Sequence, residues 1–184
     1  MTKIVAFTIF FLQSIYTTLP AIMANTAPVL TRKINFLGYP LDHYITIGGI
    51  RILGDNKTYR GLISGVVFSV ITISIQYATY KFTGFDYTLY NFEQVNFIAL
   101  GSLMGFGVMF GDAFKSVIKR RMNIPPGHSF IPWDQLDCVI GGLLFGRIVW
   151  NFPIAYGVLI IITTFFLHIL FRQVGYLLGI CEKW

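Results

Sequence analysis

Long uncharged stretches alternate along the chain with shorter segments that hold almost all of the charge. Four stretches of at least 18 residues contain no Asp, Glu, Lys or Arg: residues 4–31, 61–80, 94–111 and 148–171. Since about 20 residues of helix cross the ~30 Å hydrocarbon core of a bilayer, each stretch can supply one membrane span. The pattern predicts an all-α integral membrane protein.

A fifth span is predicted between the third and the last of these stretches. Residues 138–150 are apolar but short, and they include Arg147. Crossing the bilayer here requires a helix over residues 136–152, with the Arg147 side chain reaching an interface. Pro153 then marks the start of a new helix, because proline is tolerated at the first helical position.

The first stretch is expected to contain irregular backbone near its end. Pro20, Asn25 and Pro28 interrupt an otherwise helical pattern. Broken helix at membrane depth is tolerated only where it lines a cavity or is packed in protein, so a pocket open to the cytoplasm is predicted there. A cleaved signal peptide is disfavoured, because Lys3 alone is a thin basic region and the apolar stretch is too long.

The composition excludes an ordinary soluble domain. Of 184 residues, 55% are hydrophobic and 12% charged, with a mean hydropathy of +0.67, whereas soluble proteins carry roughly 25% charge. The length predicts a single membrane-embedded domain over residues 1–184. Cys138 and Cys181 are isolated, so neither a metal knuckle nor a redox pair is indicated.

The positive charges predict an orientation. Eleven of the 14 Lys and Arg residues fall between the first two spans, between the third and fourth spans, and in the C-terminal tail. Because basic loops stay in the cytoplasm, we expect about five transmembrane helices, an N-terminus outside and a cytoplasmic C-terminus. The net charge of +6 does not indicate nucleic acid, because the basic residues border apolar stretches, where they act on topology and on phosphate.

Carboxylates are scarce, and their placement is informative. Five of the eight acidic residues lie in the two basic loops: Asp42, Asp55, Asp112, Asp134 and Asp137. Among Lys and Arg at a membrane surface, carboxylates can form plain ion pairs, or they can hold a divalent cation against a phosphate.

Residues 111–121 continue the third span as a helix. At helical spacing, four polar residues share one face of it: Asp112, Lys115, Ser116 and Lys119. Lysine and serine suit phosphate oxygens, and aspartate suits a metal that bridges them. The alternative is a basic helix end that attracts anionic lipid headgroups.

The proline-rich loop over residues 123–133 cannot be regular structure, and it delivers Asp134 and Asp137 to the start of the fourth span. Two aspartates at i and i+3 can cap a helix, or they can point together at one cation. His128 in this loop is more typical of a solvated residue than of a metal ligand.

In the first loop, Gly54 and Gly61 enclose a polar run, residues 55–60. The glycines permit tight turns, and the run offers hydrogen-bond donors for a phosphate or a nucleotide base. A plain turn leading into the second span is the alternative.

Together these motifs resemble the CDP-archaeol synthase family, membrane enzymes related to CDP-diacylglycerol synthase. The similarity spans nearly the whole chain and rests on segments in a fixed order: residues 19–21, 24–25, 28–30, 40–42, 51–61, 111–121, 126–127 and 134–137. The chain departs from the family pattern at its end, at His168 and over residues 172–176 and 181–184.

The resemblance implies a reaction in membrane phospholipid biosynthesis in which CTP and a phosphorylated glycerolipid give a CDP-lipid and pyrophosphate, with Mg²⁺ as cofactor. We expect Asp112, Asp134 and Asp137 to bind the metal. The predicted catalytic residues are Asp112, Lys115, Lys119, Asp134 and Asp137, and the predicted substrate-binding residues are Asn56, Lys57, Arg60, Ser116 and Arg120.

Several alternatives stay open. The lipid can carry ether-linked isoprenoid chains or can be phosphatidic acid, and a non-catalytic protein that binds anionic lipids is a further possibility. A CDP-alcohol phosphotransferase is disfavoured because no Asp-Gly dipeptide occurs. A transporter is disfavoured because, apart from Asp137 at the start of the fourth span, only Arg147 and His168 could carry a charged side chain into the predicted spans, so no proton or ion path is indicated. We expect a multi-pass protein of the cell membrane whose active site faces the cytoplasm.

Overall fold

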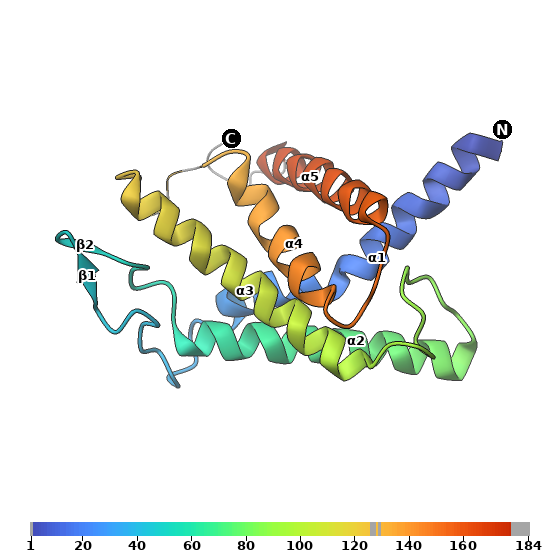
Figure 1. The fold of residues 1–184 in the computed structure, drawn as a ribbon, viewed down its shortest axis with the longest axis horizontal. Helices are drawn as coiled ribbons and strands as arrows, with labels where there is room; N and C mark the ends of the chain where they lie inside the picture. The colour runs from blue at the N-terminus through green and yellow to red at the C-terminus, as the bar shows by residue number, and fades with distance from the viewer. Residues whose placement is uncertain (1, 126–127, 129, 178–184) are drawn as a thin grey trace.

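The computed structural model describes residues 2–125, 128 and 130–177. In this part of the chain, helices account for nearly all regular structure, as predicted, and the exception is one small hairpin (Figure 1). The elements are α1 (Thr2–Leu30), β1 (Thr46–Ile47), β2 (Ile50–Arg51), α2 (Tyr59–Thr83), α3 (Phe97–Arg121), α4 (Trp133–Gly146) and α5 (Ile154–Leu177). The two strands pair antiparallel, with Thr46 opposite Arg51.

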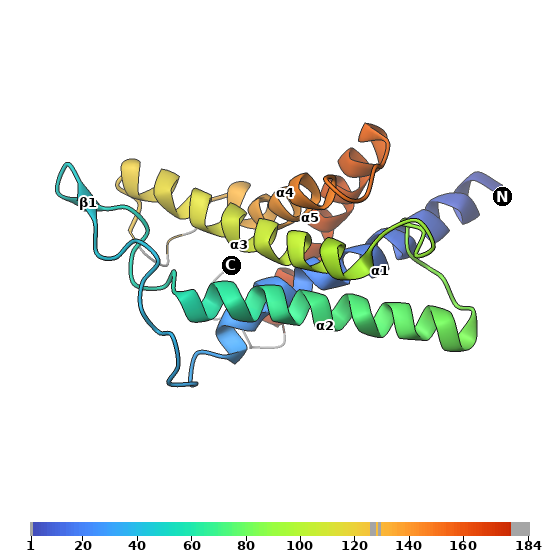
Figure 2. The same ribbon diagram turned by 60° about the horizontal axis from the view of Figure 1, so that its bottom comes forward.

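Among the residues that the structure describes, three helices are long and apolar enough to cross a membrane: α1 from Lys3, α2 and α3. Both ribbon views show α2 and α3 side by side and running in opposite directions (Figures 1 and 2). As a result the start of α2 and the end of α3 lie at the same end of the molecule, together with the hairpin (Figure 1). The later part of the chain adds α4, which packs on α3, and α5, whose segment Ile154–Leu170 is apolar.

The predicted break in the first helix is wrong, because α1 continues through Pro20 and Pro28. Proline lacks an N–H group, so the carbonyl of Tyr16, four residues before Pro20, loses its helical donor. The side-chain amide of Gln76 on α2 donates to this carbonyl at 2.6 Å. A neighbouring helix thus supplies the missing hydrogen bond, as is usual for prolines inside membrane helices.

The predicted fourth helix over residues 136–152 is also wrong in its bounds. Helix α4 begins at Trp133 and ends at Gly146, and its 14 residues extend about 21 Å, short of the ~30 Å hydrocarbon core. A turn follows, in which Arg147 Nη1 donates to the carbonyl of Phe152 at 3.0 Å. The predicted start of a new helix after Pro153 is confirmed by α5.

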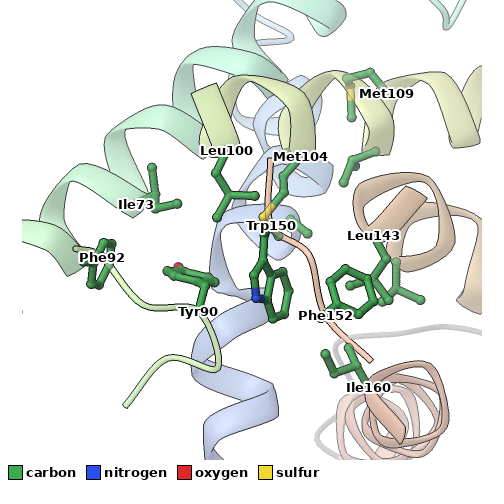
Figure 3. Packing of buried hydrophobic residues seen from close by; sticks show 14 residues of the cluster. Ile73, Tyr90, Phe92, Leu100, Met104, Met109, Leu143, Trp150, Phe152 and Ile160 are labelled. Carbon is green, nitrogen blue, oxygen red and sulfur yellow. The ribbon is translucent and has the colours of Figure 1, made fainter. Parts of the chain in front are cut away.

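The apolar core is centred on one face of α3. Leu100, Met104 and Val108, spaced four residues apart, are each at most 1% exposed. Figure 3 shows Leu100 and Met104 pointing toward the rings of Tyr90 and Trp150, whose centroids are 5.4 Å apart. The core therefore fastens the α2–α3 connection and the end of α4 to the middle of the bundle.

Helices α3 and α4 meet backbone to backbone at two glycines. A Cβ atom added to Gly107 would overlap the carbonyl of Gly141, and one added to Gly141 would overlap the carbonyl of Gly107. Small residues permit such close approach of helices in membranes. This contact brings Asp112 near the end of α3 beside Asp137 near the start of α4.

Candidate active site

The first loop, the end of α3 and the start of α4 enclose a polar cavity of about 140 Å³. It is lined by Leu53, Asn56, Lys57, Asp112, Lys115, Ser116, Lys119, Arg120 and Asp134. All four residues that the helical spacing placed on one face of α3 border this cavity. The predicted common face of these four residues is therefore confirmed.

The ammonium group of Lys115 lies at the centre of the site, among the three predicted metal-binding aspartates. Its Nζ is 2.8 Å from Asp137 Oδ2, 3.1 Å from Asp134 Oδ1 and 3.5 Å from Asp112 Oδ1. Lys119 adds a second cation, 3.7 Å from Asp134 Oδ1. The predicted catalytic residues are therefore gathered within one cluster of alternating charge.

The first loop reaches this cluster through Lys57, whose Nζ is 2.5 Å from Asp112 Oδ2. Asn56 lies beside it at the cavity wall. Arg60 is turned elsewhere: its Nη1 donates to the carbonyl of Ile34 at 2.5 Å. The structure thus brings Asn56 and Lys57 to the charged cluster, and it does not bring Arg60 there.

Arg60 instead lines a larger cavity of about 620 Å³, which lies between α1, the first loop and α3. Asn25 and Pro28 of α1 form part of its wall, so a pocket exists where the sequence predicted one. Asn56, Lys57 and Asp112 border both cavities, which places the large and the small space next to each other. Asn25 was not among the predicted substrate-binding residues, although the interruption of the first stretch at this residue already pointed to a pocket beside it.

The position of the first loop depends on Asp42, whose side chain is fully buried. Its carboxylate accepts hydrogen bonds from Arg51 Nη2 at 2.7 Å and from the backbone N–H groups of Leu53 and Gly54 at 3.0 Å. The Arg51 guanidinium, followed by these backbone donors, holds the pKa of Asp42 well below its usual range. Asp42 thereby fixes the backbone just before Asn56, a role that the sequence alone did not reveal.

The two glycines that enclose the polar run of the first loop adopt different conformations. Gly54 has a φ of +98°, a conformation that favours glycine, so the predicted turn is confirmed there. Gly61 is a residue of the first turn of α2, and the predicted second turn is wrong.

The two aspartates at the start of α4 also differ. Asp134 Oδ2 accepts the backbone N–H of Phe130 at 2.6 Å, which ties the preceding loop to the helix. The Asp137 side chain is only 4% exposed, and its Oδ1 atom has no hydrogen-bond partner among the described residues. Helix α4 begins after Pro132 and has no side-chain cap hydrogen bond, so capping accounts for neither aspartate, and the ion pair with Lys115 is the charged contact of the buried Asp137.

The remaining predicted residues lie at the edge of the polar cavity. Ser116 Oγ donates to the Asp112 carbonyl at 2.9 Å, and Arg120 Nη1 donates to the Ile124 carbonyl at 3.0 Å. His128 is exposed and contributes its carbonyl to Lys119, in agreement with a solvated loop residue.

A three-carboxylate metal site stays a prediction. Within residues 2–125, 128 and 130–177, no group of three or more His, Cys, Asp or Glu side chains is arranged to hold a metal ion. The chemistry of the donors nevertheless fits Mg²⁺, since carboxylate oxygens of three aspartates gather around Lys115 Nζ, and among the described residues the buried Oδ1 of Asp137 has no hydrogen-bond partner.

Fold and site together define a helical membrane protein with a cluster of lysine and aspartate side chains at one end of its helices. The family model of CDP-archaeol synthase (CarS-like) matches residues 6–184. The CDP-archaeol synthases of Methanocaldococcus jannaschii and Archaeoglobus fulgidus are 34% and 36% identical to the chain over 172 and 177 residues. These matches cover 93% of this chain in both cases, and 95% and 96% of the two relatives. The chain belongs to the CDP-archaeol synthase family.

A solved structure shows the same fold. It is described as an intramembrane enzyme for archaeal membrane lipid biosynthesis, and it superimposes with a TM-score of 0.70 at 24% identity. The match covers 89% of this chain and 94% of the other.

Proposed function

We propose that this chain transfers the cytidylyl group of CTP to the phosphate of an archaeal glycerolipid, in the synthesis of membrane lipids. A lipid phosphate oxygen forms a bond to the α-phosphorus of CTP, the bond from that phosphorus to the β-phosphate oxygen breaks, and pyrophosphate leaves with the electron pair. The observation that carries the proposal is the charged cluster around Lys115 in a chain that matches the family over residues 6–184.

The cations of the site neutralise phosphate charge. The polar cavity is bordered on one side by Lys115, Lys119 and Arg120 and on the other by Lys57. A phosphate placed there therefore contacts cations on both sides. No general base is required, because a phosphate monoester has its second pKa near 6 and already presents a charged oxygen at neutral pH. Catalysis then consists of positioning and charge stabilisation, as in other phosphoryl transfers.

The larger cavity accommodates the nucleoside. It lies beside the polar cavity and offers Asn25, Asn56 and Arg60 as hydrogen-bonding groups. Its volume of about 620 Å³ is in the range of small-molecule sites.

Asp112, Asp134 and Asp137 would hold Mg²⁺, which typically takes one or two carboxylates together with phosphate oxygens and water. The ion supplies positive charge against the triphosphate. The protein's own part is to keep these carboxylates together, which Lys115 does in the present structure.

The orientation follows from the distribution of basic residues. The positive-inside rule places the two basic loops in the cytoplasm, and the observed fold supports this because it gathers both loops at one end of the helices (Figure 1). The site would then face the cytoplasm, where CTP is available, in a multi-pass protein of the cell membrane.

The experiment that tests this function is an assay of the purified protein with labelled CTP, Mg²⁺ and a lipid phosphate. We expect a labelled CDP-lipid and pyrophosphate, with faster turnover of an ether-linked isoprenoid glycerol phosphate than of phosphatidic acid. Faster turnover of phosphatidic acid would assign the ester lipid as substrate. Binding of anionic lipid without consumption of CTP would contradict an enzymatic function.

A further inference from the structure

The chain that follows α1 exposes large apolar side chains, although it belongs to the first loop. Residues 32–39 project from the bundle beside the end of α1, before the chain reaches the hairpin (Figures 1 and 2). Ile34, Phe36 and Tyr39 are 54%, 65% and 50% exposed. Exposed apolar surface of this kind marks contact with a partner or with a membrane. We refer to residues 32–39 as the post-α1 segment.

The backbone of the post-α1 segment is held against the start of α2. The Tyr39 carbonyl accepts the N–H of Tyr59 at 3.1 Å. The Leu37 carbonyl accepts the N–H of Arg60 at 2.8 Å, and the Ile34 carbonyl accepts the Arg60 guanidinium. The apolar side chains are therefore presented outward from a fixed backbone, so their exposure is a property of the fold.

The length of α1 places the post-α1 segment at the level of the lipid headgroups. A helix of 29 residues extends about 44 Å, which matches the ~40–45 Å thickness of a bilayer with its headgroup regions. Val29 and Leu30, the last residues of α1, are 74% and 62% exposed, so apolar side chains face outward up to its end. Thr31 alone separates the helix from the segment. The aromatic side chains of the segment suit this depth, since aromatic residues are enriched at membrane interfaces.

The charge of the post-α1 segment fits an anionic surface. Its first two residues, Arg32 and Lys33, are exposed, and no Asp or Glu occurs among residues 1–41. The first carboxylate of the chain, Asp42, is buried and paired with Arg51. Basic residues beside a membrane span attract the anionic headgroups of the cytoplasmic leaflet, and apolar side chains next to them enter the headgroup boundary. A lipid surface thus matches both features of the segment.

We propose that the post-α1 segment binds the anionic surface of the protein's own membrane and thereby fixes one wall of the larger cavity. Arg32 and Gly38 line that cavity, and the N–H of Leu41, just beyond the segment, donates to the Lys57 carbonyl at 2.7 Å. A shift of the segment is therefore transmitted to the residues that border both cavities. The link to activity rests on the proposed function, which places the nucleoside of CTP in the larger cavity.

A nitroxide label at position 36 tests the contact with the bilayer. Phe36→Cys and its matched control Ile45→Cys are labelled in a background without Cys138 and Cys181, in vesicles of phosphatidylcholine and phosphatidylglycerol. Ile45 lies in the same loop, directly before the hairpin, and is 54% exposed. We expect the ratio of collisions with oxygen to collisions with a water-soluble nickel complex to be about threefold higher at position 36, because oxygen concentrates in the bilayer. Equal ratios at the two positions would overturn the proposal.

The lipid composition tests the part played by charge. Omitting phosphatidylglycerol should lower the collision ratio at position 36 about twofold, because the basic residues lose their anionic partners. Lys33→Gln should lower the ratio in the anionic vesicles and make it less dependent on phosphatidylglycerol. A ratio that is the same in both kinds of vesicle would contradict binding to an anionic surface.

A kinetic comparison tests the link to the larger cavity. In the anionic vesicles, Ile34→Ser combined with Phe36→Ser should raise the KM for CTP about threefold and leave kcat unchanged, because the cavity wall is no longer fixed while the charged cluster is intact. Ile45→Ser combined with Ile47→Ser is the matched control, since these side chains are 54% and 59% exposed and line neither of the two cavities. An unchanged KM in the first variant, or an equal rise in the control, would overturn the link.

The label and the assay together separate this inference from the proposed function. Membrane contact at position 36 in a protein that does not consume CTP would support the post-α1 segment and contradict the proposed function. Formation of a CDP-lipid by a protein whose position 36 is as accessible to nickel as position 45 would support the proposed function and overturn the inference.

Discussion

Lys115 holds three carboxylates together with one ammonium group. Without a cation between them, the carboxylates of Asp112, Asp134 and Asp137 would repel one another. Lys115 offsets this repulsion in the present structure, and the proposed function requires phosphate and Mg²⁺ to be accommodated around the same lysine.

Replacing any one of the three aspartates by asparagine should lower CTP turnover by about a hundredfold or more, because the change removes a major electrostatic contributor from the site. The shape of the side chain is retained and Lys115 keeps two carboxylate partners in each variant, so the variants should still insert, fold and be purified. Glu93→Gln is the control: Glu93 pairs with Lys81 at the opposite end of α2, and its loss should leave turnover unchanged. Near-normal Mg²⁺-dependent turnover in all three variants would refute the site.

The contacts of Asp42 predict that the conformation of the first loop does not change with pH at values above the usual pKa range of carboxyl groups. The pKa of Asp42 is lower in the folded than in the unfolded protein, where it is about 4. The stabilisation by Asp42 is therefore complete above the pKa of the unfolded state, and it is lost only as the pH falls through the lower pKa of the folded state. Hydrogen exchange of residues 42–57, corrected for intrinsic rates, should therefore show constant protection from pH 5 to pH 8.

Asp42→Asn should lower that protection about tenfold at pH 7, because the variant loses charge-assisted hydrogen bonds to a buried side chain. Asp55→Asn is a suitable comparison, since Asp55 also pairs with Arg51 but its side chain is 79% exposed. Equal protection in wild type and Asp42→Asn would show that the loop is held by other contacts.

At this scale the pattern of residues predicted what depends on one helix, whereas the meeting of residues from different segments was predicted only through the family resemblance. The i, i+3, i+4, i+7 spacing placed Lys115 and Ser116 on the face of Asp112 correctly, because helical geometry alone fixes that relation. The pairing of Lys57 with Asp112 joins residues 55 positions apart, and no local pattern contains it.

Among the helices, α1 shows how a neighbouring helix can keep a helix continuous at a proline that by itself predicts a break. Proline predicts a break when the chain is considered by itself, and it produced none because Gln76 donates to the freed Tyr16 carbonyl. The same side chain accepts a hydrogen bond from the Tyr90 hydroxyl at 2.7 Å, so one amide joins α1, α2 and the α2–α3 connection. Helix α4 illustrates the opposite case: its apolar residues continue past its end, and the turn at Arg147 set the true boundary.

Gln76→Leu should therefore destabilise the protein by about 1 kcal/mol, since it leaves the Tyr16 carbonyl and the Tyr90 hydroxyl without partners. Thermal unfolding in detergent micelles measures the change. Thr79→Val, which removes an exposed hydroxyl bonded within its own helix, should have a smaller effect. A melting temperature for Gln76→Leu equal to that of Thr79→Val would contradict the role given to the amide.

For the whole molecule, the two basic loops and the site lie at one end of the helices, while the α2–α3 connection lies at the other (Figure 1). If the positive-inside rule holds, single cysteines in a background without Cys138 and Cys181 should report opposite sides of the membrane. Asn123→Cys should resist a membrane-impermeant reagent added to intact cells, and Asp86→Cys should react. The reverse pattern would place the site outside and exclude the proposed source of CTP.

The glycine contact between α3 and α4 has a mechanical consequence. Two backbones that touch at Gly107 and Gly141 have no intervening side chains to yield, so we expect the helix pair to move as one rigid body when the surrounding bilayer thickens, thins or bends. The distance between Lys115 and Asp137 should then change little with the state of the membrane. Helix α5 packs against the rest of the bundle mainly along one face, so we expect most of the adjustment to the bilayer to occur there.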